Sequence, residues 1–323
     1  MSSASIGIDL MGSDVDPPTL LESALTFMQE RSLLCCLHFF GSKELHPFFL
    51  EKVQGLPLQP RVFYHPCADV ISMQDPPIRS VLRKRHSSLC QSFFSLRKGQ
   101  IGGLISCANT GALVSAAKLF LPSMPRISRP ALCAIIPTKQ RPIALLDVGA
   151  NTSLRRGHML QLALMGAAYQ KACGIHSPKV ALLNIGQEAS KGGALLQRCY
   201  QQLRDQEELF SFVGNLEPQG FFEGDGTADV VVTDGVLGNI FLKTAEAVIE
   251  CVEDILRQEK TVPPIHALAR FFTSRAPGAL LLGVKKLIIK CHGHTSIAGV
   301  LASIEALLEM LDNRLLEKME AAL

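Results

Sequence analysis

Short runs of branched apolar residues recur along the chain, and most of them end at a glycine or an asparagine just before a helical pattern begins. Seven such runs predict strands, in the segments SIGIDLMGSD, GGLISCANTG, PIALLDVGANT, KVALLNIGQE, FSFVGNLE, ADVVVTDGVLGN and KLIIKCHGH. Near-continuous apolar strands that alternate with helices are typical of a parallel sheet covered on both faces. We therefore predict a three-layer α/β/α fold with a largely parallel, doubly wound sheet, whose seven polar strand ends line one crevice.

The same pattern predicts a single domain over residues 1–323. The run GNIFLKTAEAVIECVEDILRQ opens a helical segment at about 240–276, an excursion before the last strand. With 47% hydrophobic residues, a chain of this length can fill a sizeable core.

Charge and cysteine usage narrow the class of protein. Charged residues make up 19% of the chain, the net charge is +3 and tryptophan is absent, so no global basic field indicates nucleic-acid binding. The ten cysteines include no C-x-x-C pair, which argues against a zinc site and against a disulfide framework. We expect reduced cysteines that lie mostly in the core.

The N-terminal stretch MSSASIGIDLMG has no basic residues before its apolar run, and no apolar stretch approaches the roughly 20 residues that span a bilayer. We expect a cytoplasmic protein that is not integral to a membrane. The phosphate loop G-x-x-x-x-G-K-[ST], G-x-G-x-x-G, H-E-x-x-H and G-x-S-x-G are all absent from the sequence. The functions of a kinase, a Rossmann dehydrogenase, a zinc protease and a serine hydrolase are therefore disfavoured.

Eight fragments follow one another in a specific order: IGIDLMGSDVDP, SCANTGAL, LLDVGANT, LLNIGQEASKG, FVGNLE, DVVVTDGVLGNIFLKT, LLGV and IKCHG. In this order they resemble the phosphate acyltransferases of bacterial phospholipid synthesis, the PlsX type, nearly from end to end. That family makes acyl phosphate from acyl-acyl carrier protein and inorganic phosphate. Departures from its pattern are Gly12-Ser13 in place of two glycines, Thr152-Ser153 after Asn151, HGHTS in place of HGSSD, and a shorter stretch before LLLGVKK.

The resemblance implies that a phosphate oxygen attacks a thioester carbonyl and expels the carrier thiol. This reaction needs positioning and oxyanion stabilisation, with no metal, no nucleotide, no other cofactor and no protein nucleophile. Lys191 is expected to clamp phosphate or the developing oxyanion, and His292 to donate to phosphate or to pass a proton to the leaving thiolate. From the residues alone, a solvated loop lysine and a structural histidine are the ordinary alternatives.

Polar residues at the other strand ends complete the expected site. Asn239, and Asn109 with Thr110, can donate hydrogen bonds to phosphate, and simple helix capping is the alternative for each. Asp9, Asp147 and Asp234 repel phosphate, so we expect them to orient cationic side chains or loop amides. With Lys191, His292 and Asn239 as catalytic residues, the expected substrate- and phosphate-binding residues are Asp9, Gly12, Asn109, Thr110, Gly111, Asp147, Gly149, Asn151, Asn184, Gly186, Asn215, Asp234, Gly235 and Gly238.

A local basic run, RSVLRKRHSS, stands out in a chain of nearly balanced charge. Its residues Arg79, Arg83, Lys84 and Arg85 are candidates for docking the acidic acyl carrier protein. A solvated helix face is the ordinary alternative.

The resemblance also implies a homodimer and a membrane-bound acyltransferase that uses the acyl phosphate. The segment IHALARFFTSR, residues 265–275, could lie peripherally on the inner face of the cytoplasmic membrane, because a helix there would place its apolar residues on one side. A helix packed in the dimer interface or core is the favoured alternative.

Three rival functions stay open at this point. A phosphotransacylase of the acetyl or butyryl type would use coenzyme A in place of the carrier protein. A decarboxylating dehydrogenase would require an aspartate cluster for a divalent metal, which is not evident in the sequence. A non-catalytic interaction protein would leave the many polar strand ends unexplained.

Overall fold

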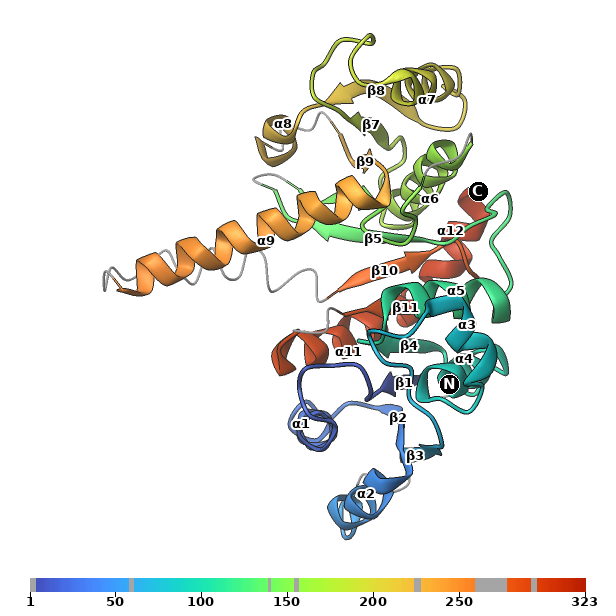
Figure 1. The fold of residues 1–323 in the computed structure, drawn as a ribbon, viewed down its shortest axis with the longest axis vertical. Helices are drawn as coiled ribbons and strands as arrows, with labels where there is room; N and C mark the ends of the chain where they lie inside the picture. Colours follow the sequence, from blue (N-terminus) through green and yellow to red (C-terminus); the bar gives the residue numbers. More distant parts are fainter. Residues whose placement is uncertain are drawn as a thin grey trace. The chain divides into compact units, whose positions relative to one another are not determined.

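The computed structural model of the chain describes residues 4–57, 61–138, 141–153, 157–223, 228–258, 278–291 and 295–323. Strands and helices alternate along these residues (Figure 1). The chain divides into two compact units, Met1–Met124 with Leu280–Leu316, and Pro125–Ala279 with Glu317–Leu323. The division was not predicted from the sequence, and the single domain stays a prediction.

The strands of the first unit lie in the order β3-β2-β1-β4-β11-β10. Their bounds are Ala4–Asp9 for β1, Cys35–Ser42 for β2, Val62–Cys67 for β3, Gly103–Ser106 for β4, Ala279–Leu282 for β10 and Leu287–Lys290 for β11. The pairs β3·β2, β2·β1, β1·β4 and β4·β11 are all parallel, so the carboxyl ends of these strands share one edge.

Helices cover both faces of this sheet. Helices α1 (Pro17–Glu30) and α11 (Ile297–Asp312) pack together on one face, and α4 (Ser88–Arg97) and α5 (Thr110–Phe120) pack together on the other (Figure 1). The unit also contains the 3-10 helix η1 (Lys43–Leu45), α2 (His46–Val53) and α3 (Pro77–Arg83). Helix α1 begins where Asp16 accepts a hydrogen bond from Thr19 N at 3.1 Å, followed by prolines that fit a first turn.

The strands of the second unit lie in the order β5-β6-β9-β7-β8. Their bounds are Ala131–Ile136 for β5, Ile143–Leu146 for β6, Lys179–Leu183 for β7, Ser211–Leu216 for β8 and Val230–Val232 for β9. Strand β5 pairs antiparallel with β6, whereas β6, β9, β7 and β8 are parallel to one another. The carboxyl ends of these four strands therefore meet at one edge.

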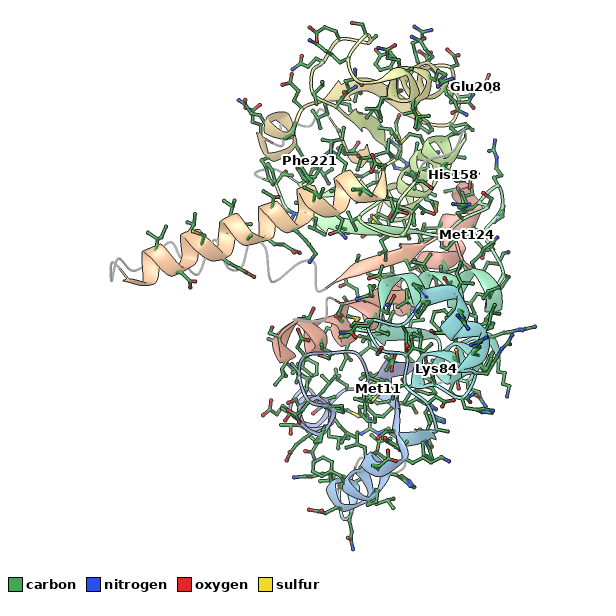
Figure 2. The ribbon with its side chains drawn as sticks, in the orientation of Figure 1. Met11, Lys84, Met124, His158, Glu208 and Phe221 are labelled. Atoms are coloured by element: carbon green, nitrogen blue, oxygen red, sulfur yellow. The ribbon has the colours of Figure 1, made fainter. Side chains whose placement is uncertain are left out.

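Helices α6 (His158–Ala172) and α7 (Ala194–Arg204) cover one face of the second sheet (Figure 1). Helices α8 (Pro218–Glu223) and α9 (Gly235–Gln258) meet on the other (Figure 1). There Phe221, labelled in Figure 2, contacts Phe241 with ring centroids 5.1 Å apart. Helix α12 (Leu315–Ala322) closes the chain. Each unit thus has helices on both sides of a sheet, which confirms the predicted three-layer α/β/α class.

All seven strands predicted from the sequence are confirmed, as β1, β4, β6, β7, β8, β9 and β11. Strands β2, β3, β5 and β10 were not predicted, because the pattern used was an apolar run that ends in a polar tip before a helix. The predicted helix after Gly238 is α9, which begins earlier, at Gly235. The continuation of that segment beyond Gln258, including residues 265–275, lies outside the described residues.

All ten cysteines are free thiols, and seven of them are buried, as expected from the sequence. Within the described ranges, no helix has both the length and the apolar character needed to cross a bilayer.

Candidate active site

Several of the expected site residues lie together in the second unit, at the carboxyl edge shared by β6, β9, β7 and β8. Asp147 follows β6, Asp234 follows β9 after one residue, Asn184 follows β7, and Asn215 is the second-to-last residue of β8. Lys191 stands in the loop after β7, and Asn239 in the first turns of α9. The parallel strands therefore bring two of the three predicted catalytic residues to one edge.

Asp147 organises the loop that follows β6. Its carboxylate, fully buried, accepts hydrogen bonds from the backbone N–H groups of Gly149 at 3.1 Å, Ala150 at 2.9 Å and Asn151 at 2.7 Å. It also accepts from Leu132 N at 3.1 Å and from Asn151 Nδ2 at 2.9 Å. Burial raises the pKa of Asp147, and these donors oppose the shift by favouring the ionised form. The predicted orienting role of Asp147 agrees with this geometry.

A consequence is that the loop amides of residues 149–151 point at Asp147. These N–H groups are already engaged, and the phosphate-binding role expected for Gly149 and Asn151 stays a prediction. Asn151 likewise donates to Pro130 O at 3.0 Å, which ties the loop to the segment before β5.

The start of α9 packs directly on this loop because two glycines leave no side chain between them. A Cβ on Gly235 would lie 2.4 Å from Asn151 O, and one on Gly238 would overlap Asp147 O. Asp234 caps the helix, since its Oδ1 accepts from Val236 N at 3.0 Å and Leu237 N at 2.9 Å.

Asn239 faces the loop at Gly149. A Cβ on Gly149 would lie 2.8 Å from Asn239 Nδ2, and Gly149 has φ +127°, a conformation that favours glycine. The asparagine amide can lie this close to the turn because Gly149 has no side chain. This places a side-chain donor near the N-terminus of α9, where the helix dipole favours anions.

The side chain of Lys191 packs closely over the backbone of Gly186. A Cβ on Gly186 would meet Lys191 Cγ at 2.8 Å and Glu188 Oε2 at 3.0 Å, so the lysine stem and the glutamate both cross the backbone there. Lys191 Nζ is 3.7 Å from Glu188 Oε1, and the two side chains are 44% and 65% exposed. Such an open contact is weak, and the ammonium is accessible to an anion.

A small surface hollow lies beside the Asn151 loop. It is lined by Arg129, Asn151, His158, Gln161, Leu162 and Met165. Arg129 adds a positive charge to this part of the second unit, and the sequence had not singled it out.

In the first unit, the strand ends form a buried polar row. Asp9 on β1 is paired in register with Ser106 on β4, and Ser106 is paired with Lys290 on β11. The three residues are buried, and Ser106 Oγ donates to Asp9 Oδ2 at 2.9 Å. Lys290 Nζ donates to the carbonyl oxygen of Cys291.

Burial raises the pKa of Asp9 to about 6, against the lowering effect of hydrogen bonds from Ser88, Ser106 and Met11 N and of the Lys290 charge. Neither Ser106 nor Lys290 was singled out in the sequence. Lys290 could have been found in the sequence, because it is a charged residue at the end of the apolar run KLIIK, where a polar position at a strand end is expected.

Two loops of the first unit meet at a glycine. Gly12 has φ +91°, and a Cβ there would lie 2.8 Å from Ala108 Cα. Asn109 caps α5 by accepting from Ala112 N at 3.1 Å, and its Nδ2 donates to Met73 O at 2.9 Å. Thr110 and Gly111 form the first turn of α5, where a Cβ on Gly111 would meet Pro77 Cγ at 2.7 Å. The capping alternative therefore describes Asn109 in this structure.

The basic run surrounds the end of α3. Arg79, Arg83 and Arg85 are exposed, and the Arg85 guanidinium lies 5.2 Å from the centroid of Phe120. Lys84, labelled in Figure 2, differs from them. Its Nζ donates to Asp75 Oδ2 at 2.6 Å and to Val70 O at 2.9 Å. Lys84 thereby ties the end of α3 to the preceding loop.

His292, the third predicted catalytic residue, lies outside the described residues, as does His294. The shared crevice of all seven strand ends stays a prediction, since three of those ends belong to the first unit and four to the second. Among the residues that the structure describes, no group of three or more His, Cys, Asp or Glu side chains is arranged to hold a metal ion.

A family model described as "Fatty acid synthesis protein" matches residues 4–318. The chain belongs to this family. The match spans both compact units, and it confirms the resemblance drawn from the order of the strand-end motifs.

Known relatives match over nearly the same length. The chain is 36% identical to the phosphate acyltransferase of Chlamydia pneumoniae over 324 residues, which covers 97% of this chain and 98% of the relative. It is 32% identical to the phosphate acyltransferase of Ehrlichia ruminantium over 312 residues, which covers 91% and 90% of the two chains.

Among solved structures, a phosphotransacetylase from Streptococcus pyogenes matches with a TM-score of 0.61 at 16% identity, covering 98% of this chain and 94% of its own. A branched-chain phosphotransacylase from Enterococcus faecalis V583 matches with a TM-score of 0.58 at 16% identity, covering 95% and 99%. These likenesses show a shared α/β fold.

Proposed function

We propose that the protein transfers a fatty acyl group from acyl-acyl carrier protein to inorganic phosphate and releases acyl phosphate for phospholipid synthesis. The observation that carries the proposal is the near-full-length similarity to proteins named phosphate acyltransferase. An accessible lysine and a positioned asparagine at one strand edge of the second unit support the same chemistry.

In the proposed reaction, a phosphate oxygen attacks the thioester carbonyl carbon and a tetrahedral oxyanion forms. The C–S bond then breaks, and the carrier leaves as a thiolate that takes up a proton. Lys191 supplies a point charge for phosphate or the oxyanion, and Asn239 supplies a donor at the start of α9. His292 is the proposed proton donor to the thiolate.

The proposed acyl donor is the acidic acyl carrier protein, and the exposed Arg79, Arg83 and Arg85 are its proposed docking surface. Lys84 belongs to the same run, but its ion pair with Asp75 gives it a supporting role there. Exposed charges of one sign steer an oppositely charged partner and fix its orientation.

We further propose a cytoplasmic homodimer that contacts the inner face of the membrane peripherally and passes acyl phosphate to a membrane-bound acyltransferase. For the dimer, the support is a series of exposed apolar side chains along α9, among them Val248, Val252 and Ile255. Light scattering on the purified chain tests the dimer. Flotation with anionic vesicles tests the membrane contact proposed for residues 265–275.

The experiment that tests the function supplies purified protein with acyl-acyl carrier protein and inorganic phosphate, without added metal or nucleotide. We expect stoichiometric release of free carrier thiol and of acyl phosphate trapped by hydroxylamine. A parallel reaction supplies acyl-coenzyme A. Turnover of coenzyme A esters alone, with no carrier-linked substrate of any chain length accepted, would favour the phosphotransacylase instead.

A further inference from the structure

Two buried asparagines stand side by side at the carboxyl ends of neighbouring strands in the second unit. Asn184 follows β7 and Asn215 lies near the end of β8, with exposed fractions of 5% and 8%. Asn184 Nδ2 donates to Asn215 Oδ1 at 3.2 Å, so the two amides are joined. Buried amides of this kind are costly unless their donors and acceptors are used.

The remaining hydrogen bonds of this pair go to the backbone of the loop that carries Lys191. Asn215 Nδ2 donates to Glu188 O at 2.8 Å, and Asn184 Nδ2 donates to Lys191 O at 3.2 Å. Asn184 Oδ1 accepts from Ile185 N at 2.9 Å. Residues 188 and 191 are themselves joined, because Lys191 N donates to Glu188 O at 3.0 Å. The turn before the lysine is therefore held at both of its ends.

A third side chain completes the support from the other side of the loop. Gln197 on α7 donates through Nε2 to Ser190 O at 2.7 Å and to Gly192 O at 3.1 Å. Together, Asn184, Asn215 and Gln197 engage the carbonyl groups of residues 188, 190, 191 and 192. We call these three side chains the amide brace.

The amide brace fixes the direction in which the Lys191 side chain leaves the backbone. Gly186 then fixes the stem, since Lys191 Cγ and Cε lie 2.8 and 2.9 Å from where a Cβ on Gly186 would stand. A lysine side chain left free on a mobile loop loses rotamer entropy when it is ordered by a ligand. A loop ordered beforehand lowers that cost and keeps the ammonium in a productive position.

We propose that Asn184, Asn215 and Gln197 are positioning residues that act on the reaction through Lys191, by fixing the backbone carbonyl groups around it. This inference rests on the proposed role of Lys191. It gives Asn184 and Asn215 a different task from the direct phosphate contact expected from the sequence. Both N–H bonds of the Asn184 amide already have acceptors, in Lys191 O and Asn215 Oδ1.

The test is a double-mutant cycle on the full chain. Asn215→Ala is expected to lower kcat 10- to 100-fold, as a displacement of about 1 Å can, with the KM for acyl-acyl carrier protein changed less than threefold. In a Lys191→Ala background, the same substitution is expected to change kcat less than twofold, because the residue through which it acts is gone. An equal loss in both backgrounds would overturn the proposal.

Hydrogen exchange without any substrate gives a readout independent of activity. Asn215→Ala is expected to speed amide exchange in peptides covering residues 185–193 at least tenfold, and unchanged exchange there would contradict the brace. A protein with no acyltransferase activity at all would refute the proposed function, while the exchange result would still decide whether the brace orders the loop.

Gln170→Ala is the matched control. Gln170 is also a buried amide of the second unit, and its Nε2 donates to Asp229 O at 2.6 Å, at the opposite edge of the sheet. We expect it to lower thermal stability but to leave kcat and exchange at residues 185–193 within twofold. Should Asn215→Ala fail to fold, the double-mutant cycle uses Gln197→Ala instead, because Gln197 is partly exposed. We expect this variant to lower kcat three- to tenfold, and we expect that loss to disappear in the Lys191→Ala background.

Discussion

Asp9 and Lys290 lie at matching positions on the two strands that flank β4, with Ser106 between them. Both side chains are buried, at 1% and 6% exposure. Burial raises the pKa of the Asp9 carboxyl to about 6, and the Lys290 charge opposes that rise. A buried charge is tolerated only when it is compensated. The pKa of Asp9 should therefore rise when the charge of Lys290 is removed.

The folded state should hold the Asp9 proton up to pH 6, whereas the unfolded chain releases it near 3.8. Stability from this group is then lost as pH rises from about 4 to 6, by an amount on the order of 3 kcal/mol. Urea unfolding across this range should show the loss in the parent protein and not in Asp9→Asn. In Lys290→Met the loss should continue above pH 6, and an unchanged profile in that variant would refute the coupling.

Lys191→Ala should lower kcat by about two to three orders of magnitude, because one donor to the phosphate or the oxyanion is removed. The melting temperature should change little, since the side chain is 44% exposed and packs mainly on a loop. Lys191→Arg should restore activity only in part, because a planar guanidinium replaces a point charge. Steady-state kinetics and thermal unfolding measure both effects, and a near-normal rate for the alanine variant would remove Lys191 from the site.

Gly149→Ala should lower kcat while the protein stays folded. The added methyl group would stand 2.8 Å from Asn239 Nδ2, and the φ of +127° at residue 149 disfavours alanine. We expect a loss of about 1–3 kcal/mol in stability and at least a tenfold loss in kcat. Asn239→Ala in the same background should add little, because the asparagine is already displaced, and a full additive loss would show that the two residues act separately.

Arg83→Glu with Arg85→Glu should reduce kcat/KM for acyl-acyl carrier protein far more than for a small acyl thioester, and most strongly at low salt. The matched control reverses Arg97 and Lys98, two exposed cations of the first unit that precede β4 at the opposite edge of the sheet. That pair makes the same change in net charge. Equal effects of the two double variants would argue against docking at the end of α3.

Arg141→Met should lower the free energy of unfolding by about 3 kcal/mol, since it leaves a buried carboxylate without its cation. Arg141 Nη2 lies 2.8 Å from Asp229 Oδ1, and Asp229 is 1% exposed. The further substitution Asp229→Asn should recover part of the loss, because Asn Oδ1 can still accept from Lys179 N. Urea unfolding measures the free energy of unfolding of both variants. Because Arg141 and Asp229 lie at the edge of the sheet opposite Lys191 and Asn239, kcat should be unchanged.

The sequence by itself determined the fold class and the residues that stand at the strand ends. An apolar run followed by a glycine or asparagine is a local signal, and it marked β1, β4, β6, β7, β8, β9 and β11. The helix-capping alternative for Asn109 also came from local pattern, and its side chain caps α5 in the structure. The capping alternative for Asn239 was wrong, because α9 begins at Gly235 and Asp234 caps it. Strand β5 and its antiparallel pairing with β6 were missed, because the run ALCAII ends in a proline without a polar tip.

Only the tertiary structure decided which polar groups are already engaged. The sequence placed Gly149 and Asn151 among the expected phosphate-binding residues, but only the structure shows that the Asp147 carboxylate accepts hydrogen bonds from the backbone N–H groups of residues 149, 150 and 151. The partner of Lys84 is Asp75, nine residues earlier, and the row of Asp9, Ser106 and Lys290 joins strands far apart in the chain. Strand register and side-chain direction set these contacts, and both depend on how distant segments pack, which a linear pattern of apolar and polar residues does not encode.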